Sequence, residues 1–564
     1  MKQIVKRLLP RPALRAAACR LPLRQRVRIA KLLVGVPNRS SRVRSHGVPA
    51  VAIAGASPAT AWHGNLQIVL GLLEDAGLDY FCVPHTDPRC SAVAVGVEHR
   101  AAVLRLLRTQ PAAPGMVVRT MDTGGRRTSP QRCRVVQVYQ AVTSPEGNAL
   151  LDGAYACEIE FWDTVKGPGW DAPRLVGPRN HRVGTVVSVD TPVEYVPAGR
   201  LSQFMPTAPE PRFRSRAVYA EPGPNDVRFP VDVVYTWVDG DDPAWQARKS
   251  KAMGTDDSFN GLATNASRFT SRDELLYSMR SLHAFAPWVN HIYLVTDDQV
   301  PSWLDLSSNR VTLVSHREIF GDVGVLPTFN SHAIESRLHR VPGLSEHFLY
   351  FNDDMILGRP VLPGQFFFAN GVAKFFPSSS LVDLNPPAPA DHPVDVAAKN
   401  NRRLIQARFG TQVYQKMRHV PYPLLRTVLE EIETEMREES HATASHQFRD
   451  RGDLSIPSSL AHYWAHSTGR SVPGGIAHVY IDLGRLVAPV MLARLVRQRN
   501  TDVFCLNDTN SQVADLDEQA QMVREFMDAY FPFKAPWELA DAAGRMGLTQ
   551  QRRDTTPTHP KVTA

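Results

Sequence analysis

His347-Phe-Leu-Tyr-Phe-Asn-Asp-Asp-Met-Ile-Leu357 is the stretch from which the fold and its site can be inferred. The run from Phe348 to Phe351 has the length and aromatic content of a buried strand, and it ends at Asn352, Asp353 and Asp354. Adjacent carboxylates at the end of a buried strand are costly to desolvate unless a cation or donors compensate them. Because ligands bind beyond the carboxyl ends of strands in open α/β sheets, the stretch predicts a divalent cation holding a phosphorylated substrate. A simple turn is the alternative interpretation.

Two further stretches repeat this pattern. An apolar run over 231–238 leads into Asp239-Gly-Asp-Asp-Pro243, and another over 291–296 leads into Asp297 and Asp298. Three strands that each end in paired aspartates are hard to explain as unrelated turns. The pattern therefore predicts that the three strand ends share an acidic cation site.

Charge is distributed unevenly along the 564 residues. The net charge is +8, but the first 50 residues hold thirteen Lys or Arg and the first acidic residue is Glu74, so the remainder carries −5. This asymmetry favours an N-terminal arm attracted to anionic lipid or polyanions, with a solvated basic tail as the alternative, and it does not favour a nucleic-acid-binding fold.

The same composition bears on localisation. No secretory signal and no apolar run of about 18 residues is present. The six cysteines have no CxxC spacing, which indicates neither a zinc site nor a disulfide scaffold. We expect a cytoplasmic protein, with peripheral contact at the inner face of the cell membrane as an open alternative.

Composition and periodicity divide the chain into seven segments. Helical and strand-like runs alternate after the basic arm and indicate a small accessory α/β unit, in which no catalytic motif is found. A stretch rich in Pro, Arg and Ser separates it from the main domain. The predicted segments are a basic arm (1–45), the accessory unit (50–200), a linker (201–230), a catalytic core (231–375), a Pro-rich insertion (376–400), a helical region (401–548) and a polar tail (549–564).

Two helix starts within the core are candidate site elements. Ser271-Arg-Asp-Glu274 has the form of a capping box before an amphipathic helix that Pro287 ends, and Arg272 at its amino end could bind a phosphate. Ser331 is a plausible cap for a second helix over 333–340, where His332 and Glu335 could act as a base or as donors to a substrate. Surface positions on a first turn are the alternative for both.

Four blocks of this sequence together resemble the Stealth family of sugar-phosphate transferases. The blocks are 232–243, 272–354 (Arg272-Asp-Glu-Leu through Asn352-Asp-Asp), 419–425 (His-Val-Pro-Tyr-Pro-Leu-Leu) and 504–508 (Phe-Cys-Leu-Asn-Asp). The resemblance covers about residues 231–540 and is most specific in the second block, whereas residues 1–200 lie outside it.

The resemblance implies an exopolysaccharide or capsular polysaccharide phosphotransferase. Such an enzyme moves a sugar 1-phosphate from a nucleotide-sugar donor, typically a UDP-sugar, to a hydroxyl of a glycan acceptor and releases a nucleoside monophosphate. It implies a Rossmann-like, GT-A-type catalytic core. With the helical C-terminal additions and the small N-terminal α/β accessory unit that the sequence pattern predicts, the expected fold class is α/β. Charge neutralisation by a metal and by arginine suits phosphoryl transfer.

The resemblance also assigns roles to residues. Mg²⁺ or Mn²⁺ is expected on Asp353, Asp354, Asn507 and Asp508, and Asp353 is counted with the catalytic residues. Substrate binding is expected at Trp237, Asp239, Arg272, Asp273 and Asn352, with Arg449 near the phosphates. For the acceptor proton, His332 and His419 are both candidates, and the sequence does not choose between them.

Two other functions compete with this one. A metal-dependent GT-A glycosyltransferase would use the same acidic site but transfer the sugar without its phosphate. A non-catalytic membrane-associated module is disfavoured, because an empty cluster of carboxylates would repel itself.

Overall fold

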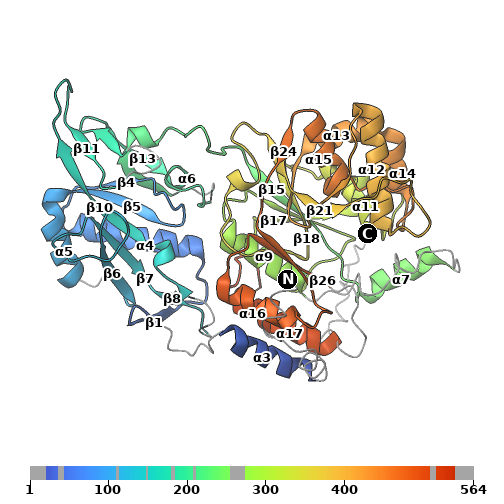
Figure 1. The fold of residues 1–564 in the computed structure, drawn as a ribbon, viewed down its shortest axis with the longest axis horizontal. Helices are drawn as coiled ribbons and strands as arrows, with labels where there is room; N and C mark the ends of the chain where they lie inside the picture. The colour runs from blue at the N-terminus through green and yellow to red at the C-terminus, as the bar shows by residue number, and fades with distance from the viewer. Residues whose placement is uncertain are drawn as a thin grey trace, which may run out of the picture.

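The computed structural model describes residues 21–35, 44–109, 113–145, 147, 150–179, 185–206, 211–254, 273–507 and 516–539. Within these residues the protein is a mixed α/β structure in two parts that lie side by side (Figure 1). The first part is formed by residues 44–219 and the second by residues from 231 onward, with the N-terminal helix α3 (Leu23–Val34) packed below the second part.

A seven-stranded mixed sheet forms the first part. Its central strands are almost wholly buried because helix α4 (Pro58–Asp75) covers them through side chains such as Trp62 and Leu66. α4 begins with a capping box in which Ser57 and Thr60 exchange hydrogen bonds. The other elements of the sheet and its helices are β4 (Phe81–Val83), β5 (Ser91–Gly96), β6 (Met116–Met121), β7 (Val135–Gln140), β10 (Cys157–Val165), β11 (Arg174–Val176), β12 (Val186–Ser188), α5 (Arg100–Thr109) and α6 (Ala198–Leu201). Short strands β1 (Arg44–Ser45), β2 (Val48–Pro49), β3 (Val51–Ala52), β8 (Val142–Thr143) and β9 (Leu150–Leu151) lie at its edge.

A strand lies inside the stretch whose composition predicts a linker. β14 (Arg212–Arg216) pairs antiparallel with β13 (Val193–Pro197), and Ser215 Oγ donates a hydrogen bond to the Cys82 carbonyl at 2.6 Å. Phe213 and Ser215 are buried, while the three arginines that alternate with them are more exposed, which is the alternation of a half-buried strand. The Arg- and Pro-rich composition conceals this alternation.

The second part is built on a five-stranded sheet of order β17-β16-β15-β18-β23. Four of its strands are parallel: β15 (Val231–Thr236), β16 (Ile292–Thr296), β17 (Val311–Ser315) and β18 (His347–Asn352). The fifth, β23 (Tyr422–Leu425), is antiparallel to β18 and places Tyr422 opposite Tyr350. The strands predicted over 231–238, 291–296 and 348–351 are thereby confirmed.

Helix α9 (Glu274–Phe285) packs on this sheet and contributes Leu275, Met279 and Leu282 to the hydrophobic core between them. Its end before Pro287 agrees with the sequence, but its start does not. Asp273 is the N-cap, with φ of 63° and no side-chain capping hydrogen bond, so the helix begins later than a cap at Ser271 predicts. The other helices of this half of the core are α7 (Pro243–Met253), α10 (His316–Phe320) and α11 (Ser331–Glu335).

The helix predicted over 333–340 is also different. It consists of the short α11, capped by Asn330 rather than by Ser331, and a 3-10 turn over Leu338–Arg340. Asn330 Oδ1 accepts the hydrogen bond from the His332 N–H at 3.1 Å. The capping residue therefore precedes the one that the sequence favoured.

A second sheet continues directly from β18. β19 (Met355–Leu357) pairs with β26 (Val503–Asn507), which pairs with β25 (His478–Asp482). Helices cover the remaining faces (Figure 1). The remaining elements are β20 (Ala373–Phe375), β21 (Pro377–Leu381), β22 (Gln415–Met417), β24 (Ser471–Pro473), α12 (Pro393–Phe409), α13 (Arg426–Glu435), α14 (Arg437–Ser445), a π-helical turn (Ile456–Leu460), α15 (Ala461–Ser467), α16 (Ala488–Gln498) and α17 (Leu516–Tyr530).

Among the described residues, we find no helix that combines the length and the apolar character needed to cross a bilayer.

Candidate functional site

The carboxyl ends of β15, β16 and β18 meet at one edge of the five-stranded sheet. These strands are adjacent and parallel, and Thr236 is in register with both Val295 and Asn352. The residues that follow each strand therefore leave the sheet on the same side. This is the edge at which the sequence predicts an acidic site.

Asp353 and Asp354 form a tight turn between β18 and β19. The turn predicted as the alternative is therefore present, and it carries both aspartates of the predicted cation site. Since β19 pairs with β26, Met355 lies opposite Cys505, and Cys505 Sγ is 3.0 Å from Asp354 Oδ2. On the other side, His419 Nε2 lies 3.0 and 3.2 Å from the two carboxylate oxygens of Asp354.

His419 reaches this position because of the antiparallel strand. It precedes β23 by a few residues, so it lies beside the carboxyl end of β18. The Tyr422 hydroxyl is 3.4 Å from His419 Nδ1. One ligand atom from each of Asp354, His419 and Cys505 lies within 4.8 Å of the others, a spacing that would allow all three to bind one metal ion.

The two aspartates have opposite electrostatic behaviour. Burial raises the pKa of Asp353 well above its usual value, and the neighbouring Asp354 and Glu274 raise it further. Burial acts in the same direction on Asp354, but the charge and hydrogen bond of His419 outweigh it and lower the pKa of Asp354. Burial and the nearby Asp354 raise the pKa of the Cys505 thiol well above 9, so this thiol is a hydrogen-bond donor to Asp354.

The composition of this group fits a divalent cation. The side-chain oxygen Oδ1 of Asn352 is buried and has no hydrogen-bond partner among the described residues. It precedes two carboxylates whose charges repel each other, and such a set of hard oxygens suits Mg²⁺ or Mn²⁺. His419 and Cys505 are softer donors at the edge of the same group.

A second cluster adjoins the first and is centred on Glu335. The Tyr350 hydroxyl donates to Glu335 Oε1 at 3.2 Å. Burial raises the pKa of Glu335, against the opposing effects of the nearby His332, Arg449 and His419. The three predicted catalytic residues other than Asp353 therefore surround one buried carboxyl group.

His332 is held by a carboxylate behind it. Its Nδ1 is 3.4 Å from Asp453 Oδ2, and Asp453 also accepts hydrogen bonds from Asn330 Nδ2 at 2.8 Å and the Asp450 N–H at 3.0 Å. Burial raises the pKa of Asp453, but the effects of His332, the Asp450 N–H and His446 outweigh burial and lower this pKa. The carboxyl group of Asp453 therefore stays ionised. Arg449 donates from Nη2 to Ser331 Oγ at 2.8 Å.

Asp239 and Asp273 lie at a separate part of the edge. The Gln299 side chain accepts a hydrogen bond from the Asp239 N–H and donates one to the Asp239 carbonyl, each at 3.0 Å. Asp239 Oδ1 accepts from the Asp241 N–H, also at 3.0 Å. Burial raises the pKa of Asp273; Arg524 opposes the shift, and Asp239 and Asp528 add to it. Trp237 follows β15, donates its backbone N–H to the Val295 carbonyl and is half-buried against the core.

Some predicted acidic groups have other roles. Asp297 accepts two hydrogen bonds from Arg248, at 3.0 and 2.7 Å, and the exposed Asp298 lies 3.3 Å from Arg317. The third strand end is therefore occupied by ion pairs. Asn507 is the last residue of β26, two positions beyond Cys505. Arg272 and Asp508 lie outside the described residues.

Two residues near the aspartate pair were not predicted. Glu274, which the spacing predicts as the last member of a capping box, is the first residue of α9 and raises the pKa of Asp353. Cys505, whose spacing from the other cysteines indicates no metal site, contacts Asp354. Its position in an apolar strand that ends in Asn507 was the available signal.

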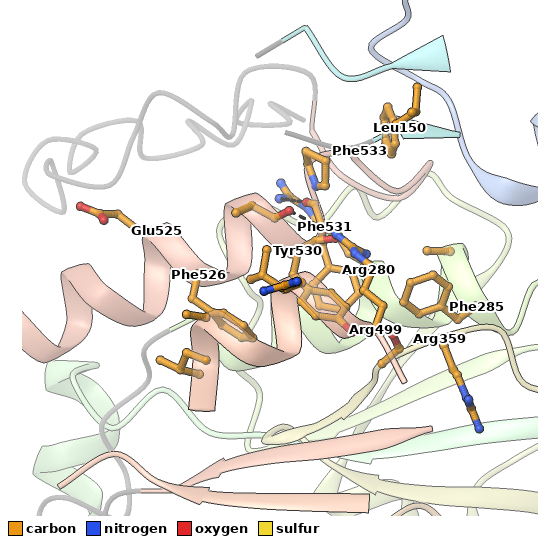
Figure 2. Close-up of a pocket in the computed structure, with 18 of the residues that line it drawn as sticks. Leu150, Arg280, Phe285, Arg359, Arg499, Glu525, Phe526, Tyr530, Phe531 and Phe533 are labelled. Atoms are coloured by element: carbon orange, nitrogen blue, oxygen red, sulfur yellow. Dashed lines mark hydrogen bonds between the residues drawn. The ribbon is translucent and has the colours of Figure 1, made fainter. Parts of the chain in front are cut away.

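The cavity in Figure 2 is a different feature. It has a volume of about 550 Å³ and lies between the carboxyl-terminal half of α9, α17, α16 and the first part of the protein. Arg280, Phe285, Tyr530 and Phe531 are among its lining residues, and none of the acidic pair is. Arg280 within it donates two hydrogen bonds of 2.8 Å to Glu538.

Comparison with known proteins places these residues in four matched regions. The family models for Stealth protein conserved regions 1, 2, 3 and 4 match residues 229–257, 268–375, 418–466 and 493–545. Two exopolysaccharide phosphotransferases of Streptomyces coelicolor are 46% and 41% identical, covering 87% and 93% of this chain and 84% and 92% of their own length. The exopolysaccharide phosphotransferase CpsY of Mycobacterium tuberculosis is 34% identical over 86% of this chain and 90% of its own length.

The chain belongs to the Stealth family.

The four Stealth regions account for the site's composition. Region 2 supplies Glu274, the group around Glu335 and the aspartate pair, while region 3 supplies His419, Arg449 and Asp453. Cys505 lies in region 4. Each Stealth region is separate in sequence, and three of them meet around Asp354 and Glu335 because β18, β19, β23 and β26 are neighbours.

Proposed function

We propose that this protein is an exopolysaccharide phosphotransferase that moves a sugar 1-phosphate from a nucleotide sugar to a glycan hydroxyl. The donor would be a UDP-sugar, and a nucleoside monophosphate would be released. The observation that carries this proposal is the convergence of Asp353, Asp354, His419 and Glu335 from separate Stealth regions onto one edge of a parallel sheet. The names of the relatives support the same reaction.

The parallel order β17-β16-β15-β18 supports a Rossmann-like, GT-A-type core. Such cores bind nucleotides beyond the carboxyl ends of their strands. On this basis Trp237, Asp239 and Asp273 would line the nucleotide pocket, and Arg272 would lie beside it.

Asp353, Asp354 and the Oδ1 atom of Asn352 would hold Mg²⁺ or Mn²⁺. When bound, the cation supplies neutralisation of the diphosphate charge. His419 would keep Asp354 ionised and oriented, because its ring contacts both carboxylate oxygens. The buried Cys505 thiol would hold the same carboxylate from the opposite side.

The acceptor proton would pass to His332. Asp453 contacts its Nδ1 atom, which leaves Nε2 without a hydrogen-bond partner among the described residues. This carboxylate–imidazole arrangement orients a general base. Because His419 already contacts the Asp354 carboxylate, we favour His332 over His419 for this role. Arg449, held by Ser331 beside Glu335, would stabilise charge on the transferred phosphate.

A panel of nucleotide sugars tests the proposal. The purified protein would be incubated with each donor, Mg²⁺ and an acceptor glycan, and the released nucleotide identified. We expect a nucleoside monophosphate and a phosphodiester in the product. Release of a nucleoside diphosphate with a glycosidic bond would instead identify a metal-dependent glycosyltransferase.

A further inference from the structure

The N-terminal helix α3 is fixed to the carboxyl-terminal part of the chain. Leu23, Val27, Ala30 and Val34 recur at helical spacing and form its inner face, which packs on α16 and α17. In Figure 1 this helix runs along the lower side of α16 and α17. The basic segment is therefore a structured part of the molecule over this helix.

Polar contacts hold both ends of α3. At its start, the Leu23 N–H donates to Glu518 Oε2 at 3.0 Å and Arg24 donates to Gln521 Oε1 at 2.6 Å. At its end, Arg497 donates to the Val34 carbonyl. These contacts determine which face of α3 points away from the protein.

That outer face is apolar in its centre. Ile29, Leu32 and Leu33 are 42%, 79% and 48% exposed, although leucine and isoleucine gain free energy on leaving water. Three adjacent aliphatic side chains on one helix face differ from the scattered apolar residues that any surface carries.

Basic residues border this apolar face. On a helical wheel, Arg24, Arg28 and Lys31 lie along one flank and Arg26 along the other. The segment around the helix adds to this charge, since the first 50 residues hold thirteen Lys or Arg and no acidic residue. An apolar strip between basic flanks is the pattern of a helix that lies in the plane of a membrane interface.

We propose that α3 docks this protein on an anionic lipid bilayer, with Ile29, Leu32 and Leu33 entering the interface and the flanking basic residues facing lipid phosphates. Two other occupants fit the surface less well. A second copy would bring a like-charged surface against this one, and a nucleic acid has no apolar phase to receive the three aliphatic side chains. The proposal does not depend on the reaction that the site catalyses.

Docking through α3 would also orient the site. Helix α17 packs against α3 and carries Asp528, whose Oδ1 atom accepts a hydrogen bond from the Tyr277 hydroxyl of α9 at 2.7 Å. α9 begins at Glu274, beside the aspartate pair. One layer of helix thus separates the membrane-facing helix from the elements of the acidic edge.

Vesicle sedimentation of the full-length protein tests the proposal. Phosphatidylcholine vesicles with and without phosphatidylglycerol would be compared for the wild type, for Ile29→Ser/Leu32→Ser/Leu33→Ser, and for Arg28→Gln, which leaves the contact of Arg24 with Gln521 in place. Leu381→Ser/Leu384→Ser is the matched control, because these leucines of the Pro-rich insertion (376–400) are also exposed, at 63% and 64%. Unchanged thermal unfolding of each variant would verify its fold.

We expect the wild type and the control to sediment only with the anionic vesicles and to be released by salt. The serine variant should partition more weakly by at least about tenfold. The glutamine variant should lose about fivefold in partition, which is the contribution of roughly one basic residue at an anionic surface. Three results would overturn the proposal: equal binding by the serine variant, equal binding to neutral vesicles, or a wild type that forms α3-dependent dimers without binding lipid.

Discussion

At the residue scale, Asp354 combines the contacts that the site depends on. It accepts from His419 and Cys505, which come from different Stealth regions, and it follows Asp353 in a tight turn. A charged carboxylate is retained here because a cationic imidazole and a thiol donor offset its desolvation. Burial, Asp354 and Glu274 instead raise the pKa of its neighbour Asp353, so this carboxyl group would favour protonation until a cation is bound.

Replacing Asp354 should abolish transfer without unfolding the protein. Asp354→Asn keeps the shape of the turn but removes the charge, so we expect kcat to fall by about 10³-fold or more. Steady-state kinetics with a nucleotide sugar and Mg²⁺ would measure this. Asp298→Asn is the matched control, since Asp298 also follows a strand of this sheet, β16, but is exposed and pairs with Arg317. If the Asp354 variant matched this control, Asp354 would have no role in metal binding.

Cys505 should act through its hydrogen bond rather than as a metal ligand. The pKa of its thiol is raised well above 9, so Cys505→Ser preserves a donor to Asp354. We expect the transfer rate of Cys505→Ser to lie within about tenfold of the wild type. Cys505→Ala should lower the apparent affinity for Mg²⁺ by about 10–100-fold. Titration of activity against Mg²⁺ distinguishes the two variants. Equal losses in both would indicate that sulfur itself binds the metal.

His332 should contribute to the chemical step more than to donor binding. His332→Gln keeps a polar side chain but cannot accept the acceptor proton, so kcat should fall by about 10²–10⁴-fold with little change in KM for the donor. The same substitution at His419 serves as the comparison. A larger kcat effect at His419, with His332→Gln near normal, would assign the base to His419.

At the scale of elements, Glu433 of α13 links four other groups. Its carboxylate accepts from Arg337 at 2.9 Å, from Arg340 at 2.9 Å and from His441 at 3.1 Å, and lies 2.5 Å from His339 Nε2. Arg337 is wholly buried, and this is its carboxylate partner. The network therefore joins the 3-10 turn after α11 to α13 and α14.

Glu433→Gln should destabilise the protein by about 3–5 kcal/mol, because it leaves the buried Arg337 charge uncompensated. Urea denaturation would measure this change in the free energy of unfolding.

The contribution of Glu433 should depend on pH. Burial raises the pKa of Glu433, but His339, Arg340 and Arg337 outweigh burial and hold this pKa far below 4.5. A carboxyl group whose pKa is lower in the folded than in the unfolded state stabilises the protein at pH values above the unfolded-state pKa. This contribution is lost as the pH falls toward the folded-state pKa. The difference between wild type and variant should thus be constant above about pH 5 and shrink below pH 4.5; a pH-independent difference would contradict this assignment.

The elements also show what the sequence can and cannot predict. The strand ends of β15, β16 and β18 were predictable, because apolar runs ending in aspartates indicate buried strands and parallel strands share one edge. The position of His419 was not, because it depends on β23 pairing antiparallel with β18. Cys505 depends likewise on the pairing of β19 with β26, about 150 residues apart in the chain. Such long-range pairings leave no periodic signal in the sequence.

Two motifs have structural roles that differ from those their spacing predicts. The Ser271–Glu274 motif has the right spacing for a capping box, yet α9 starts at Glu274 after an Asp273 in the left-handed region, and Glu274 faces Asp353 instead. Asp297 and Asp298 repeat the motif of the other strand ends but are bound by Arg248 and Arg317. These two aspartates form ion pairs because arginines from other parts of the sequence lie next to them in the fold.

At the scale of the whole molecule, Stealth regions 2, 3 and 4 converge on one sheet edge, and the N-terminal helix packs on α16 and on α17 of region 4. The first part of the protein, residues 44–219, contributes to the cavity of Figure 2 rather than to the acidic edge. Its His85 lies 3.0 Å from Glu158 in a buried pair, which is a structural role. The residues of the proposed site that the structure describes thus all lie from residue 231 onward.

The central claim is that the phosphate next to the sugar travels with the sugar. The most direct measurement uses a UDP-sugar labelled with ³²P in its β-phosphate, incubated with the protein, Mg²⁺ and a glycan acceptor. We predict that the label appears in the glycan product and that unlabelled UMP is released. Label recovered only in released UDP, with an unlabelled glycan that has gained the sugar, would contradict sugar-phosphate transfer.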